Sequence, residues 1–145
     1  MKKLKVILGA FALIASLALI GCNPSVGPQN NNTTQEAAKE TVVATGEKGT
    51  FFKWADYSIT ADNAASYIVR VTYTLDNAEK AGWGPGAFAD NAWKGVDSLN
   101  AKLNVSAAGV NEVSVTDIIK ALPDGFLVNW WADYATLKKV EIIKK

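Results

Sequence analysis

Tryptophan is the residue type that stands out for chemistry in this chain, which contains five of them. Trp83 lies between glycines in Ala81-Gly-Trp-Gly-Pro, a loop with few apolar neighbours that could bury it. Trp130 and Trp131 are adjacent in Phe126-Leu-Val-Asn-Trp-Trp. An exposed aromatic surface usually marks a contact with a partner. The flat face of an indole suits the C–H face of a sugar ring, so these residues indicate a stacking site.

Alternation separates the two neighbouring tryptophans if residues 125–135 form a strand, as their composition predicts. Successive side chains of a strand point to opposite faces. Trp130 then shares a core face with Phe126 and Val128, whereas Trp131 shares the other face with Asn129. Trp131 and Asn129 are expected to meet solvent or a ligand. Trp130 joins them only if a bulge breaks the alternation.

The remaining aromatic and polar candidates are less sharply defined. Trp93 lies in an expected loop, where it either extends the stacking surface or packs on the domain. Trp54 follows Phe51 and Phe52, so we expect it in the core. Arg70, the sole arginine, is expected either in an ion pair or as a donor to sugar hydroxyls. The polar residues that could bind hydroxyls in this way are Arg70, Asn100, Lys102, Asn104 and Asn129.

The residue types and motifs of the sequence give little support for a catalytic or metal site. The sequence has no histidine, which excludes Ser-His-Asp and Cys-His chemistry and histidine-ligated metals. A carboxylate pair could serve a glycosidase, but no motif singles one out, so we expect no enzyme. We expect no cofactor either; a structural calcium ion at Asp56, Asp62 and Asn63 is the alternative. The loop aspartates expected at the surface are Asp56, Asp62, Asp90, Asp97 and Asp133.

The N-terminus has the pattern of an export signal. Basic residues in Met1-Lys-Lys-Leu-Lys precede an apolar run over residues 6–20, which is short for a membrane span. Leu19-Ile-Gly-Cys22 resembles the bacterial lipobox. The resemblance implies cleavage after residue 21, diacylglycerol on Cys22 and, in many bacteria, N-acylation. Two acyl chains give stable anchoring, since one chain alone binds a membrane only marginally. Asn23 follows the cysteine and favours the outer membrane or cell surface within the cell envelope.

Residues 22–40 read as a flexible tether rich in proline, glycine and asparagine. Removing Lys2, Lys3 and Lys5 leaves 12 basic against 14 acidic residues, a net charge of −2. Nucleic-acid binding is therefore not expected, because it requires clustered lysine and arginine.

Residues 41–145 are expected to form an all-β domain. The clearest strand covers residues 66–75, where Tyr67, Val69 and Val71 alternate with polar residues. One short helical turn is expected over residues 117–122, between Thr116 and Pro123. Short strands with turns between them favour an antiparallel β-sandwich of jelly-roll type. The other expected strands cover residues 41–44, 50–54, 57–60, 99–105, 112–116, 125–135 and 136–143.

The block Phe126-Leu-Val-Asn-Trp-Trp-Ala and the later Leu137-Lys-Lys-Val-Glu-Ile resemble the closing strands of β-sandwich carbohydrate-binding modules. The similarity covers about residues 67–142 and is greatest to β-glucan- and cellulose-binding modules of anaerobic plant-degrading bacteria. It implies a sugar platform at Trp83, Trp130 and Trp131. Such modules normally accompany a catalytic domain or dockerin, whereas a lipid anchor suits capture of a polysaccharide at the cell surface. The alternative is a structural or protein-interaction lipoprotein without a sugar ligand.

Overall fold

The computed structural model describes residues 39–145, all within one compact unit, Glu36–Lys145. The expected signal peptide, the lipidation site at Cys22 and nearly all of the expected tether lie outside the described residues. No helix in residues 39–145 is long and apolar enough to cross a bilayer.

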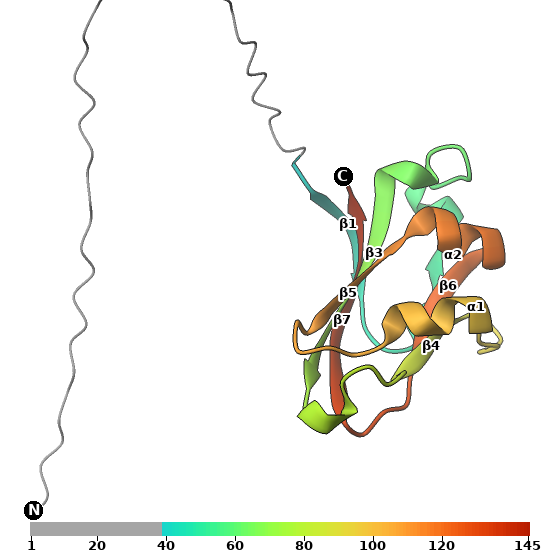
Figure 1. Cartoon of the computed structure of the whole chain (residues 1–145). Helices are drawn as coiled ribbons and strands as arrows, with labels where there is room; N and C mark the ends of the chain where they lie inside the picture. Colours follow the sequence, from blue (N-terminus) through green and yellow to red (C-terminus); the bar gives the residue numbers. More distant parts are fainter. Residues whose placement is uncertain (1–38) are drawn as a thin grey trace, which may run out of the picture. The chain divides into compact units, whose positions relative to one another are not determined.

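Two antiparallel sheets form the domain (Figure 1). The four-stranded sheet has the order β1-β7-β3-β5, and the three-stranded sheet has the order β2-β6-β4. This arrangement confirms the expected all-β sandwich. The strands are β1 (Thr41–Gly46), β2 (Phe52–Lys53), β3 (Tyr67–Leu75), β4 (Gly86–Ala89), β5 (Val110–Ser114), β6 (Gly125–Trp130) and β7 (Ala135–Lys144).

The core lies between the sheets and follows from alternation along the strands. Val69 and Val71 of β3 are fully buried, as are Phe126 and Val128 of β6. The rings of Phe52 and Phe126 stack with centroids 5.0 Å apart. Burying one such side chain contributes about 1.5–3 kcal/mol. The alternating pattern of β3 therefore predicted its core face correctly.

Short helices connect the strands and complete the core. Two α-helical segments and four 3-10 segments occur in residues 39–145, which is more helix than the single turn we expected. Figure 1 shows α1 and α2 on the same side of the molecule as β4 and β6. The segments are η1 (Trp54–Tyr57), η2 (Ala64–Ser66), η3 (Ala78–Lys80), α1 (Asp97–Asn100), η4 (Ala101–Leu103) and α2 (Val115–Ala121).

The strand expected over residues 99–105 was wrong, because this stretch forms α1 and η4. Leu99 and Leu103 are buried in the core, whereas Ala101 between them is exposed. A spacing of four residues places side chains on one face of a helix, and this stretch has few β-branched residues to favour a strand.

The region after β2 also differs from expectation. The strand expected over residues 50–54 contracts to Phe52–Lys53, and η1 follows directly from Trp54. The strand expected over residues 57–60 does not form, because Tyr57 ends η1 and residues 58–60 form a turn and irregular backbone. Ser58 ends η1 in the left-handed region, with φ of 55°. A strand cannot contain that conformation, so the chain turns here.

Candidate functional site

The five tryptophans divide into two buried and three exposed side chains. Trp54 and Trp130 are 2% and 4% exposed. Trp83, Trp93 and Trp131 are 55%, 50% and 59% exposed. Half of a large apolar ring in water is unfavourable unless a partner covers it. The exposed three are therefore the natural starting point for a binding site.

Trp130 does not belong to the exposed surface, which corrects its place in the expected sugar platform. Its ring packs against Tyr73 with centroids 5.7 Å apart, in the core. Its Nε1–H donates to the carbonyl of Ala135 at 2.8 Å, so the polar atom is satisfied as well. No bulge interrupts the pairing of β6 with β4, and alternation directs Trp130 inward.

Trp131 follows β6 and points away from the core, as alternation predicted. Its backbone N–H donates to the carbonyl of Pro85 at 3.0 Å, and that of Ala132 donates to the same oxygen at 3.1 Å. The loop from β6 to β7 is therefore fastened to the segment that precedes β4. Asn129, half-buried, occupies the same outer face of β6, opposite Ala87 of β4.

Trp93 lies across the outer face of β6. It comes from the loop after β4, on one side of β6, yet its ring reaches Gly49, whose N–H donates to the carbonyl of Val128 from the other side. Leu127, also on this face, is only 1% exposed. The indole thus shields part of the sheet while half of its own surface stays in solvent.

Trp83 lies at the end of the three-stranded sheet beside Tyr134. The two rings meet edge to face with centroids 6.3 Å apart, and the Tyr134 hydroxyl donates to the carbonyl of Gly84 at 2.8 Å. Lys80 Nζ lies 3.8 Å from the centroid of the Trp83 ring. This cation–π contact is worth about 0.5–1 kcal/mol at an exposed site, so a ligand could displace the ammonium group at small cost.

Asn104 is a polar neighbour of this cluster. The N–H of Gly82 donates to the carbonyl of Val105 at 2.7 Å, and the N–H of Val105 donates to the carbonyl of Trp83 at 3.0 Å. These bonds bring the exposed Asn104 beside Gly84. Its side-chain amide therefore offers hydrogen bonds next to the aromatic rings.

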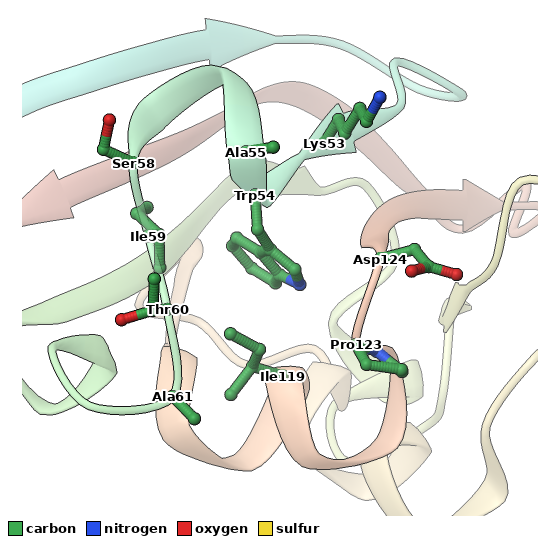
Figure 2. Close-up of a pocket in the computed structure, with 10 residues that line it drawn as sticks. All are labelled: Lys53, Trp54, Ala55, Ser58, Ile59, Thr60, Ala61, Ile119, Pro123 and Asp124. Carbon is green, nitrogen blue, oxygen red and sulfur yellow. The ribbon is translucent and has the colours of Figure 1, made fainter.

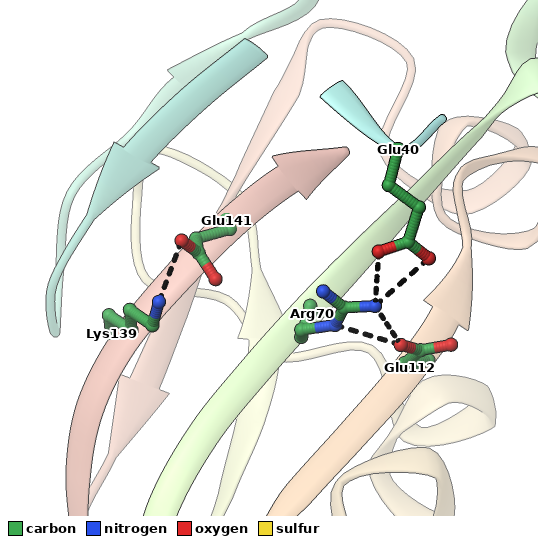
Figure 3. A network of polar contacts seen from close by, with 5 residues as sticks. All are labelled: Glu40, Arg70, Glu112, Lys139 and Glu141. Carbon is green, nitrogen blue, oxygen red and sulfur yellow. Dashed lines mark hydrogen bonds and ion pairs between the residues drawn. The ribbon is translucent and has the colours of Figure 1, made fainter. Parts of the chain in front are cut away.

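Arg70 is not part of this surface, which corrects its assignment as a sugar donor. It lies on β3 in the four-stranded sheet, where Nε donates to Glu112 at 2.8 Å and Nη2 to Glu40 at 2.9 Å (Figure 3). Hydrogen bonds to Glu112 and then Glu40 raise the pKa of Arg70 above its ordinary value. The guanidinium is engaged in ion pairs, the other role that the sequence left open.

Other polar candidates serve their own loops or neighbouring segments. The side chain of Asn63 accepts from the N–H of Thr60 and donates to the carbonyl of Ser58, so it is already engaged. Lys102 pairs with Asp117 at 3.1 Å. Within residues 39–145, no group of three or more acidic, cysteine or histidine side chains gathers around a possible metal position.

An apolar cavity of about 450 Å³ lies between η1 and the end of α2 (Figure 2). Trp54 and Ile119 form its centre, and the hydroxyls of Ser58 and Thr60 point away from the Trp54 ring. The Nε1–H of Trp54 is already bonded to the carbonyl of Leu122 at 2.8 Å. The indole N–H is therefore not free to bind a ligand in the cavity, and the charged side chains of the lining are those of Lys53 and Asp124.

The structure thus places Trp93, Asn129 and Trp131 on the outer face of the three-stranded sheet and Trp83 at its end. Sequence reasoning did not identify Gly49 or Lys80. Gly49 contacts the ring of Trp93, which is distant in sequence, and the contact of Lys80 with Trp83 depends on the conformation of their loop. Tyr134 had a visible signal, since it follows Trp131 closely in the same aromatic segment. No protein-family model, curated protein or solved structure matches the chain.

Proposed function

We propose that this domain binds a polysaccharide of the β-glucan type by aromatic stacking and performs no catalysis. The observation that carries the proposal is the exposure of Trp83, Trp93 and Trp131 around one sheet while the other two tryptophans are buried. The resemblance of the closing strands to glucan-binding modules supports the choice of glycan. The resemblance of Leu19-Ile-Gly-Cys22 to a lipobox supports attachment to the cell envelope.

The energy available from this surface is sufficient for glycan binding. A tryptophan side chain has roughly 150–250 Å² of surface, so covering the exposed half of one ring removes about 100 Å² from water. At about 25 cal/mol per Å² this contributes about 2.5 kcal/mol per ring before ordering costs. Two rings acting together would contribute about 5 kcal/mol, which corresponds to a dissociation constant of about 0.2 mM before ordering costs.

Polar neighbours suit a neutral, hydroxyl-rich ligand. The amide of Asn129 lies on the same face as Trp131, and Asn104 and Tyr134 flank the Trp83 loop. Amide and hydroxyl groups both donate and accept, as sugar hydroxyls do. The proposal thus combines apolar stacking with neutral hydrogen bonding.

Calorimetric titration tests the proposal. A soluble form comprising residues 36–145 is titrated with soluble β-glucans and with an unrelated α-glucan. Binding of the β-glucan, lost in Trp93→Ala/Trp131→Ala and kept in Arg70→Ala, is the expected result. If the wild type binds no β-glucan or cellulose, the proposal is wrong and the protein-interaction alternative gains weight.

A further inference from the structure

Trp93 has an unusual backbone conformation, with φ of 64° in the left-handed region. Bulky residues rarely adopt this region, and such strain persists only where the surroundings enforce it. The Asp90 side chain enforces it here, because Oδ1 accepts from the N–H of Ala92 and of Lys94, both at 2.9 Å. The N–H of Trp93 itself donates to the carbonyl of Asp90 at 3.0 Å.

Gly49 receives the far end of the Trp93 ring. A Cβ atom at Gly49 would lie 2.7 Å from Cη2 and 3.2 Å from Cζ2 of the indole, so any side chain there would displace the ring. Gly49 also has a positive φ of 77°. Its N–H donates to Val128 at 3.0 Å, which fixes this contact against the middle of β6.

We infer that Gly49 is a positioning residue that lets the Trp93 indole lie across β6, in line with Asn129 and Trp131. This inference rests on the proposed glycan-binding function. Trp131 lies three residues beyond Val128, or about 10 Å along a strand. The two indoles therefore contact different sugar rings of one extended chain, with Asn129 between them.

A double-mutant cycle tests the role of Gly49 in binding. Gly49→Ala is measured in the wild type and in Trp93→Ala, with a β-glucan oligosaccharide longer than a disaccharide as the probe. We expect about a tenfold loss of affinity in the wild type, typical of an important contact, and no further loss in Trp93→Ala. Equal losses in both backgrounds, or no loss in either, would overturn the inference.

A ligand-free measurement separates this inference from the proposed function. The Trp93 indole N–H resonance is followed by NMR in the wild type, Gly49→Ala and Gly82→Ala. Gly82 is the matched control, because its φ is 88° and a Cβ there meets nothing within 4 Å. Both alanines strain the backbone, but only Gly49→Ala should shift the Trp93 resonance.

The outcomes of the two experiments are distinct. In one outcome, the Trp93 resonance shifts only in Gly49→Ala and the wild type binds no glucan. Gly49 would then position Trp93 as inferred, but the proposed glycan-binding function would be wrong. An unshifted Trp93 resonance in a folded Gly49→Ala protein would reject the positioning role even if glucan binds.

Discussion

The outer faces of the two sheets differ in how their side chains are satisfied. On the four-stranded sheet, Arg70 pairs with Glu40 and Glu112, and Lys139 pairs with Glu141 at 2.8 Å. On the three-stranded sheet, the indoles of Trp93 and Trp131 remain half in water. The charged groups of the first face are paired within the chain, whereas the second face leaves indole surface that the proposed glycan would cover.

This difference supports the proposal that the exposed indoles bind a ligand. Exposed ion pairs contribute only about 0–1 kcal/mol each, but they make a face soluble and leave little for a ligand to gain. The solvent-exposed half of each indole contributes nothing to folding and carries a risk of aggregation. Four predictions test the contrast.

The largest expected effect belongs to the inner side of β6. Trp130→Ala should lower the free energy of unfolding by about 3–5 kcal/mol, because it leaves a cavity and removes the donor to Ala135. Trp131→Ala, one residue away, should change it by less than about 1 kcal/mol. Urea denaturation measures both. Similar losses would contradict the assignment of the two residues to opposite faces.

The next effect concerns binding. Trp93→Ala/Trp131→Ala should weaken β-glucan binding at least about 100-fold, since each ring lost is worth about tenfold or more. The melting temperature should stay within about 5 °C of the wild type. Calorimetry and a thermal melt on the same samples separate the two effects. A large fall in the melting temperature would show that the two rings stabilise the fold.

A smaller effect is expected at Trp83. Trp83→Ala should weaken binding about tenfold, whereas Lys80→Ala should strengthen it about two- to fivefold by freeing the indole face from its cation–π contact. Glucan titrations of the two variants in parallel provide the measurement. Unchanged affinity in Trp83→Ala would remove this ring from the site.

The smallest effect is expected on the charged face. Arg70→Ala should lower the free energy of unfolding by at most about 1 kcal/mol, less at high salt, and leave glucan affinity unchanged. Because the Arg70 pKa is raised, its contribution is present below its ordinary pKa and is lost only as the pH rises through the raised value. The difference in the free energy of unfolding between the wild type and Arg70→Ala should therefore be the same at pH 6 and at pH 9, as measured by urea denaturation.

Alternation predicted from the sequence what depends on a single strand. The core faces of β3 and β6 and the exposure of Trp131 followed from a period of two. Alternation also placed Trp130 in the core, which is correct, whereas the resemblance to carbohydrate-binding modules implied that Trp130 is exposed. Residues 99–105 show its limit, because Leu99 and Leu103 fit a helix as well as a strand.

Contacts between distant segments could not be predicted in the same way. The contact of the Trp93 ring with Gly49 depends on the register of β6 with β2 and with β4. No local sequence pattern specifies that register. The ion pairs of Arg70 likewise depend on the pairing of β3 with β5. The sequence therefore predicted the exposure of Trp131 and the burial of Trp54 more reliably than the contacts between distant segments.

The connection between β6 and β7 has a consequence for local opening. It passes from one sheet to the other, and it is tied by the Trp130–Ala135 bond and by two amides on Pro85. Exposing the amides of Trp131 and Ala132 therefore requires this connection to separate from the segment before β4. Their hydrogen exchange should be slower than that of unbonded loop amides, although the Trp131 side chain stands in solvent.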